Sequence, residues 1–219
     1  MALGVEIYFC ERAVAGALEV NPASKLAGII LAAGASRRMG TPKALLDYRG
    51  ETFLARLVRV LGAVCDPVIV AVGQHEAEIR AQVRTGVKFV VNPDPERGQL
   101  SSLQTALAAL PANAEGFVFT PVDSPAVAPE TVAKLAAAFQ SRASETLLVI
   151  PRHQGRKGHP VFAARSVAEE LLALPPTAQA REVIRGHADR TLFVDLDDAG
   201  VLTDVDDPAA YRELTGSTR

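Results

Sequence analysis

The sequence predicts a three-layer α/β domain with a mostly parallel central sheet. Short, continuous apolar runs recur along the chain, and such runs are typical of strands that are covered on both faces. Segments with helical periodicity separate these runs, and the alternation of strand and helix predicts parallel pairing. With 219 residues, of which 48% are hydrophobic and 22% are charged, the chain can bury one substantial core. We therefore expect one domain over residues 25–219.

The expected elements follow in chain order. Residues 1–24 precede the first strand as an N-terminal extension, which is either a short extra element or a leader. The predicted strands are short apolar segments, at 26–32, 68–72, 87–91, 116–120, 147–150 and 192–196. The predicted helices have an apolar face, at 52–61, 76–83, from near 98 to about 110, 130–139, 167–174 and 180–186. Residues 152–162 are predicted to form a loop, and Asp207 before Pro208 is expected to cap a final helix.

The segment that follows the first predicted strand has the composition of an anion-binding loop. Gly34 and Gly40 leave no side chain between the main-chain N–H groups and a ligand, so phosphate oxygens can be bound directly. Arg37, Arg38 and Lys43 bring three positive charges to the same region. The five residues between the two glycines do not fit a Walker loop, and the spacing also excludes a dinucleotide fingerprint and a nucleophile elbow.

This segment resembles the first loop of a nucleotidyltransferase family, L-A-A-G-x-S-x-R-M-G-x-P-K. The ten matching residues are Leu31, Ala32, Ala33, Gly34, Ser36, Arg38, Met39, Gly40, Pro42 and Lys43. The molybdenum cofactor cytidylyltransferases and the similar guanylyltransferases carry this loop, and the resemblance covers about residues 26–215. It implies a Rossmann-like nucleotidyltransferase fold with the site at the carboxyl ends of the strands. The alternative is an ordinary strand-to-helix turn with solvated arginines.

The resemblance also implies roles for individual residues in a nucleotide site. The expected nucleotide-binding residues are Leu31, Ala32, Ala33, Gly34, Ser36, Arg38, Gly40, Lys43, Asn92, Gly98 and Ser102. Among the expected catalytic residues Arg38, Lys43 and Asp123, Lys43 would stabilise charge on the α-phosphoryl group in the transition state. Ser101, beside Ser102, is expected either to contact the base or ribose of the nucleotide or to serve as a plain helix cap.

Asp123 is the expected metal ligand. It follows the predicted strand 116–120, and a carboxylate beyond the carboxyl end of a central parallel strand can hold Mg²⁺ against a triphosphate. The resembled family has a metal motif, Asp-x-Pro, at this point. Residues 202–208 resemble the acidic C-terminal motif of the family, D-x-D-T-P-E-D, which implies Asp206 as the second metal ligand, with Asp204 as a substitute. The expected cofactor is therefore Mg²⁺. The alternative for Asp123 is an Asx turn before Pro125.

Lys157, Gly158 and His159 are the expected acceptor-binding residues. Gly-His-Pro matches a family motif on the acceptor side of the cleft, and a cationic loop would suit a phosphorylated pterin. The alternative for His159 is a histidine in a turn whose ring forms hydrogen bonds with backbone groups.

The expected reaction is transfer of CMP from CTP to the terminal phosphate of a molybdopterin-type acceptor, with release of pyrophosphate. Ala33 favours CTP, because the guanylyl-transferring relatives usually have glycine at that position. The alternatives are guanylyl transfer to the same acceptor, a sugar-phosphate nucleotidyltransferase, and a non-catalytic protein that binds a nucleotide or cofactor. A recipient molybdoenzyme is a further possible partner.

Composition argues against several other classes. A net charge of -2 and a pI near 6.1 do not fit a general nucleic-acid binder. Cys10 and Cys65 are far apart in the sequence, and the four histidines lack zinc-ligand spacing, so neither a disulfide framework nor a zinc site is expected. Since no apolar run approaches the roughly 18 residues of a membrane span, we expect a cytoplasmic protein without a membrane partner.

Overall fold

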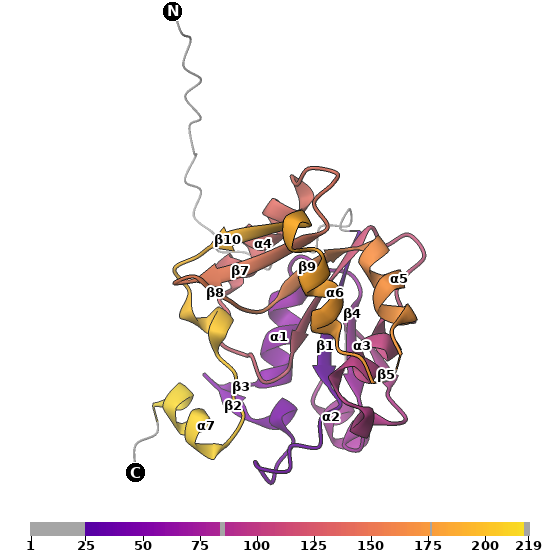
Figure 1. Cartoon of the computed structure of the whole chain (residues 1–219). Coiled ribbons are helices and arrows are strands. Elements are labelled where there is room, and N and C mark those ends of the chain that lie inside the picture. Colours follow the sequence, from indigo (N-terminus) through magenta and orange to yellow (C-terminus); the bar gives the residue numbers. More distant parts are fainter. Residues whose placement is uncertain (1–24, 84–85, 176, 217–219) are drawn as a thin grey trace, which may run out of the picture.

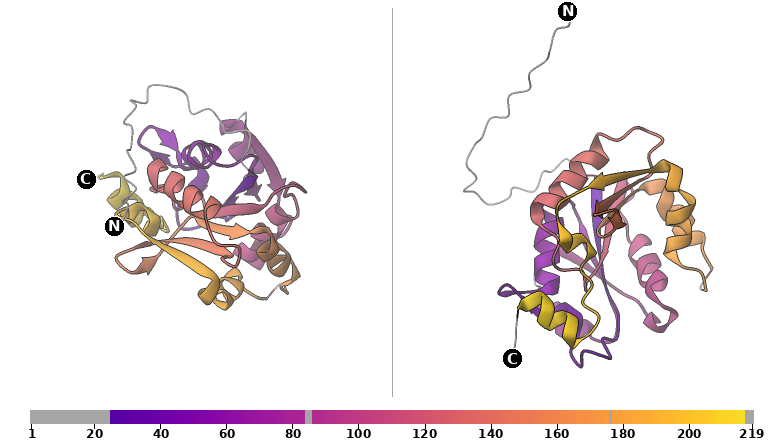
Figure 2. Two further views of the ribbon diagram at one scale, coloured as in Figure 1. Left: turned by 90° about the horizontal axis from the view of Figure 1, so that it is seen from above. Right: turned by 60° about the vertical axis from the view of Figure 1, so that its left-hand side comes forward.

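The computed structural model describes residues 25–83, 86–175 and 177–216. The expected N-terminal extension and Cys10 lie outside these described residues. A central sheet is covered by helices on both faces, as predicted (Figure 1). The right-hand view of Figure 2 shows the three layers edge-on.

The main sheet has eight strands, and most of them are parallel. They are β1 (Leu26–Ala32), β4 (Val68–Val72), β5 (Val87–Val91), β6 (Gly116–Pro121), β7 (Leu148–His153), β8 (Arg156–Lys157), β9 (Val161–Ala164) and β10 (Thr191–Asp195). The order is β10-β7-β9-β6-β1-β4-β5, and β8 pairs with β7. Strand β9 is antiparallel to both of its neighbours, β6 and β7. A separate hairpin consists of β2 (Asp47–Tyr48) and β3 (Glu51–Thr52).

The helices form two layers, each with its own hydrophobic core. On one face lie α1 (Phe53–Gly62), α2 (Glu76–Gln82), α4 (Pro129–Gln140) and α7 (Pro208–Thr215). On the other lie α3 (Gln99–Leu107), α5 (Arg165–Ala173) and α6 (Ala180–Gly186). Four short 3-10 helices complete the described chain: η1 (Lys43–Leu45), η2 (Pro95–Arg97), η3 (Ala188–Arg190) and η4 (Ala199–Leu202).

Strand β1 shows why both faces are covered. Its side chains alternate between the two cores: Ile30 packs with α1 and α4, whereas Ile29 and Leu31 pack with α3 and α5. Ile29 and Ile30 are both 0% exposed, and full burial of such a side chain contributes about 1.5–3 kcal/mol. The unbroken apolar run of β1 thus reflects a central strand that is covered by helices on both faces.

The prediction of a loop over residues 152–162 was wrong. This region contains the end of β7, the two residues of β8 and the start of β9. Strand β9 inserts between β6 and β7, so its hydrogen bonds come from residues distant in sequence. The predicted cap of the last helix is confirmed, since the Asp207 side chain accepts hydrogen bonds from the N–H groups of Ala209 and Ala210.

The parallel strands bring their carboxyl ends to one edge of the sheet. The loops after β1, β5 and β6 therefore meet there. The segment before α7 reaches the same edge, where the Val205 N–H donates to the Asp123 carbonyl at 2.9 Å. Among the described residues, no helix has both the length and the apolar character that a membrane span requires.

Candidate active site

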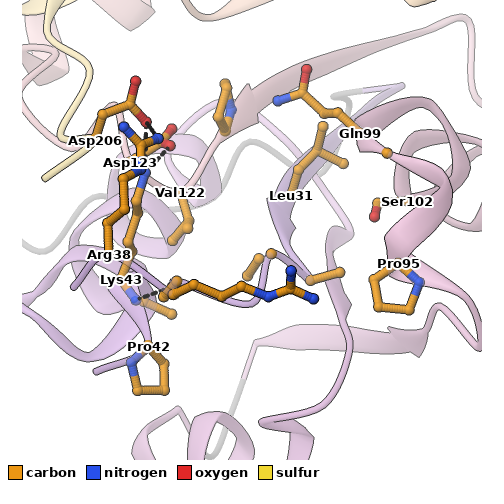
Figure 3. A pocket seen from close by; sticks show the side chains of 18 residues that line it. Leu31, Arg38, Pro42, Lys43, Pro95, Gln99, Ser102, Val122, Asp123 and Asp206 are labelled. Atoms are coloured by element: carbon orange, nitrogen blue, oxygen red, sulfur yellow. Dashed lines mark hydrogen bonds and ion pairs between the residues drawn. The ribbon is translucent and has the colours of Figure 1, made fainter. Parts of the chain in front are cut away.

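A cavity of about 340 Å³ opens at this edge of the sheet (Figure 3). It is lined by the loop after β1, by η1, by the start of α3, by the end of β6 and by the segment before α7. The expected site residues that line it are Leu31, Ala32, Ala33, Gly34, Ser36, Arg38, Lys43, Gly98, Ser102, Asp123 and Asp206. Residues from four separate parts of the sequence are thus brought together.

Lys43 lies between two carboxylates on one wall of the cavity. Its Nζ is 2.8 Å from Asp123 Oδ2 and 2.9 Å from Asp206 Oδ1, and its side chain is only 14% exposed. Burial lowers the pKa of Lys43, but the hydrogen bonds and charges of the two carboxylates outweigh this and leave the pKa above its ordinary value. The hydrogen bond and charge of Lys43, with a smaller effect of Arg38, lower the pKa of Asp206. Lys43 and Asp206 are therefore both charged at neutral pH.

The loop after β1 is shaped by its own hydrogen bonds. The Ser36 hydroxyl accepts from the Lys43 backbone N–H at 2.9 Å, and the Ser36 carbonyl accepts from the Met39 N–H at 2.9 Å. Ser36 and Gly40 both have positive φ, 49° and 69°. Gly40 does not line the cavity, so it contributes the turn rather than a contact surface. A methyl group on Gly34 would meet no atom within 4 Å, which leaves this backbone open to a ligand.

The opposite wall contains the apolar Pro95 and the polar Gln99 and Ser102, and Arg37 reaches its edge through a pair with Glu96 at 2.9 Å. Figure 3 shows Pro95, Gln99 and Ser102 facing the wall that carries Arg38, Lys43, Asp123 and Asp206. Sequence reasoning missed Gln99, although it opens α3 directly after Gly98, which has a φ of 97°. A helix that starts at the carboxyl edge of a parallel sheet presents its first side chains to the crevice, and that was the available signal.

Asn92 does not line the cavity, although the sequence suggested nucleotide binding. It is 4% exposed, and its amide nitrogen donates to the hydroxyls of Ser101 and Ser102 at 2.8 and 3.0 Å. Its amide oxygen accepts from the Asp94 N–H at 3.0 Å. Asn92 therefore positions the start of α3 from behind. The plain helix cap considered for Ser101 is not observed, because Gly98 occupies the N-cap position.

Buried polar contacts hold Asp123 in place. Arg56 of α1 is 7% exposed and donates to the carbonyls of Pro125 and Val127 at 2.7 and 3.3 Å. Ser124, 2% exposed, donates to Asp204 at 2.7 Å. Sequence reasoning assigned no role to Arg56, although a charged residue next to Leu57 in the apolar face of a helix was a usable signal.

Lys157, Gly158 and His159 line a second hollow of about 270 Å³, which also includes Arg156 and Asp204. The His159 ring lies 6.2 Å from the Phe119 ring, and its Nδ1 is buried with no hydrogen-bond partner in the part of the chain that the structure describes. Burial lowers the pKa of His159 despite the charges of Asp204 and Asp123, so the ring is neutral at pH 7. The expected acceptor residues are thus together, but outside the first cavity.

The segment between η4 and α7 separates the two hollows. Asp206 lines the first, whereas Asp204 lines the second and accepts from Ser124. Asp206 and Asp204 were the two candidates for a second metal ligand beside Asp123. Asp206 is the one that shares the Lys43 ammonium with Asp123.

The donor set suits a magnesium ion that is completed by a substrate. Within residues 25–83, 86–175 and 177–216, no three His, Cys, Asp or Glu side chains are arranged to hold a metal alone. Two carboxylates, Asp123 and Asp206, converge on one cation in the described structure, and that cation is the Lys43 ammonium. Mg²⁺ is commonly bound by one or two carboxylates together with substrate phosphates and water.

The fold and the cavity define an α/β domain of the nucleotidyltransferase class, with its candidate site at the carboxyl edge of the sheet. The MobA-like NTP transferase domain matches residues 28–191. The chain therefore belongs to this family, which confirms the family and the Rossmann-like nucleotidyltransferase fold expected from the sequence.

Individual relatives agree with this assignment. The chain is 45% identical over 107 residues to a probable molybdenum cofactor guanylyltransferase of Opitutus terrae, covering 48% of this chain and 51% of that protein. It is 30% identical over 155 residues to a protein of the same name from Bacillus cytotoxicus, covering 68% and 73%. The chain thus spans about half the length of the first relative and more of the second.

A solved structure is similar over most of its length. The protein Rv0371c of Mycobacterium tuberculosis H37Rv superposes with a TM-score of 0.74 and 34% identity, covering 89% of this chain and 99% of that one. The same protein has also been solved in complex with manganese, and that structure superposes with a TM-score of 0.70 and 30% identity over 88% and 99% of the two chains.

Proposed function

We propose that this protein transfers a nucleotidyl group from a nucleoside triphosphate to the terminal phosphate of a molybdopterin-type acceptor, with release of pyrophosphate. The observation that carries the proposal is Lys43, held between Asp123 and Asp206 beside a loop with open backbone. Family membership and the names of the two curated relatives support the same chemistry.

The chain's own residues would act mainly by positioning and by charge neutralisation. The loop around Gly34 would bind the triphosphate through its N–H groups, with Arg38 on the phosphate oxygens. Lys43 would stabilise the charge that develops at the α-phosphoryl group. An acceptor phosphate oxygen forms the new bond to the α-phosphorus as the α–β bridging bond breaks, and pyrophosphate leaves. The acceptor phosphate is already ionised, so the reaction needs no general base.

Asp123 and Asp206 would hold Mg²⁺. When bound, the ion would neutralise phosphate charge and polarise the α-phosphoryl group. The manganese complex of Rv0371c supports a divalent cation in a structurally similar protein. The second hollow, with Arg156, Lys157 and His159, would receive the acceptor, because its cations suit a phosphate group and its histidine lies beside an aromatic ring.

The names of the relatives favour guanylyl transfer over the CTP reaction expected from the sequence. Both curated relatives are named guanylyltransferases. GTP is therefore the first donor that we propose. Ala33, which is 4% exposed and lines the cavity, keeps CTP as the second candidate through the resemblance of its loop to that of the cytidylyltransferases.

The decisive experiment measures pyrophosphate release with Mg²⁺, a molybdopterin-type acceptor and GTP, CTP, ATP or UTP in turn. Release with GTP supports guanylyl transfer, and release with CTP alone would restore cytidylyl transfer. Release with a sugar phosphate but not with the pterin would show that the acceptor is a sugar phosphate. Nucleotide binding without pyrophosphate release from any pair would favour the non-catalytic alternative. The proposal implies a cytoplasmic location and a recipient molybdoenzyme for the product.

A further inference from the structure

We propose that Lys43 acts as an internal substitute for the divalent cation, occupying the carboxylate pair until metal and nucleotide arrive together. This inference rests on the metal site of the proposed function and adds a role for Lys43 before the chemical step. Lys43 would thereby make tight metal binding conditional on the presence of the triphosphate.

The Lys43 ammonium lies 2.8 and 2.9 Å from one oxygen of each carboxylate. Mg²⁺ binds carboxylate oxygens at about 2.0–2.1 Å. A metal ion that bridged Asp123 Oδ2 and Asp206 Oδ1 would overlap the present position of the ammonium. Lysine and metal therefore compete for the same two oxygens.

Lys43 and Arg38 balance Asp123 and Asp206, because Arg38 lies 3.5 Å from Asp206 Oδ1. A dication that entered with Lys43 in place would add two uncompensated positive charges next to an ammonium. The side chains of Lys43 and Asp123 are only 14% and 22% exposed, so water would screen this repulsion less there than at Asp206, which is 58% exposed. The free protein should thus resist the metal.

The Lys43 side chain can reach a second set of partners in the same cavity. The backbone N–H of Lys43 is anchored by the Ser36 hydroxyl, while its four-carbon stem is flexible. The same loop lines the cavity with Gly34 and Arg38, where triphosphate oxygens would offer the ammonium new partners. When Lys43 turns to the phosphates, both carboxylates become available.

The backbone that carries Asp123 does not depend on Lys43 for its position. Asp123 is held through the Val205 N–H bond to its carbonyl and through the contacts of neighbouring Ser124 and Pro125. Removing the lysine should therefore leave a site that is prepared for a cation. Metal and nucleotide then bind with positive coupling, and such coupling is reciprocal between the two ligands.

The test is Mn²⁺ binding to the full chain without nucleotide, followed through the electron paramagnetic resonance signal of free Mn²⁺. Lys43→Met and Lys43→Gln should bind Mn²⁺ at least about tenfold more tightly than the wild type, within the usual range of coupling between sites. Lys43→Arg keeps a cation and should bind as weakly as the wild type. A second substitution, Asp123→Asn, in the Lys43→Met background should abolish the gain.

Arg37→Met is the matched control for loss of one positive charge. Arg37 lines the same cavity, but it pairs with Glu96 at 2.9 Å rather than with the carboxylates. The inference is overturned if Lys43→Met and Lys43→Gln gain no more than Arg37→Met does. It is also overturned if the wild type already binds Mn²⁺ as tightly as they do. Pyrophosphate release by the wild type is scored separately, so failure of the proposed function is distinguished from failure of this inference.

Discussion

The two hollows of the site differ in how their glycines are surrounded. Around the nucleotide loop, a methyl group added to Gly34 or Gly40 would meet no atom within 4 Å. Around the second hollow, a methyl group on Gly158 would collide with the Val201 carbonyl, and one on Gly200 with the Ala126 carbonyl. The first hollow thus has open backbone, whereas the wall of the second is formed by backbone packed on backbone.

This difference separates two kinds of constraint. In the first hollow, Gly34 leaves its backbone open to a ligand, so a change at Gly34 should affect binding or turnover more than stability. The wall of the second hollow depends on close packing between the β8–β9 connection and η4, where the His159 N–H also donates to the Val201 carbonyl at 2.9 Å. Changes there should affect stability first.

The largest effect is expected for Lys43→Ala, which removes the cation of the first hollow. Turnover should fall by about 10²–10³-fold, the usual cost of losing one donor that stabilises transition-state charge. The fold should remain intact, because Lys43 belongs to neither hydrophobic core, and melting should show only the loss that comes from two carboxylates left without their shared cation. Steady-state pyrophosphate release and thermal melting measure the two effects, with Lys134→Ala on the exposed side of α4 as the control. An active Lys43→Ala enzyme would remove Lys43 from the mechanism.

Gly158→Ala should show the opposite pattern. The added methyl group forces the β8–β9 connection away from η4, and overpacking of this kind costs about 1–3 kcal/mol in the free energy of unfolding. Denaturant unfolding measures the loss. Gly186→Ala, where a methyl group would meet no atom within 4 Å, is the matched control and should not be destabilised. Equal stability of the two variants would contradict the close packing of the second wall.

Gly34→Ala should leave the free energy of unfolding within about 0.5 kcal/mol of the wild type, as for a site without neighbours. Its methyl group would instead stand where phosphate oxygens approach. The KM for the nucleotide should rise about fivefold, which corresponds to about 1 kcal/mol. Unchanged nucleotide affinity would show that the triphosphate does not contact this backbone. The open backbone of the first hollow would then have no role in binding.

The smallest effect is expected from His159 and concerns pH. Burial lowers the pKa of His159 in the folded protein, while the unfolded chain has a pKa of about 6.5. Below this pH the unfolded state takes up the proton first, so stability should be constant above pH 6.5 and fall as the pH decreases towards the folded-state pKa. Comparing denaturant unfolding of the wild type and His159→Gln from pH 7.5 to 5.5 measures this difference. A wild-type curve parallel to that of His159→Gln would show that His159 does not titrate differently on folding.

The sheet was largely predictable because its central strands are locally distinctive. The predicted bounds of β1, β4 and β5 agree with the structure: β1 and β4 are continuous apolar runs, and β5 is apolar except for Lys88. Strand β9 was not predicted, because four residues after a Gly-His-Pro sequence carry little local signal. Its pairing with β6 and β7 depends on contacts that form only in the folded sheet.

The same distinction applies to the site. The loop from Leu31 to Lys43 is contiguous, so its residue types and spacing were visible in the sequence. Arg56 and Gln99 each carried a local signal, but what their side chains face depends on where α1 and α3 dock. The resemblance implied nucleotide binding by Asn92, but its side chain donates to the serines of α3 instead of lining the cavity.

The second carboxylate enters the site from a segment that follows every strand of the sheet. Asp206 lies just before α7, whose Tyr211 hydroxyl donates to the Asp47 carbonyl at 2.8 Å and whose Tyr211 ring lies 6.0 Å from Phe53. During synthesis, the sheet, the phosphate loop and Asp123 all leave the ribosome before Asp206 does. A nascent or truncated chain that ends before Asp206 would hold every strand but only one of the two carboxylates. The site can therefore be complete only after translation has continued more than ten residues beyond the last strand.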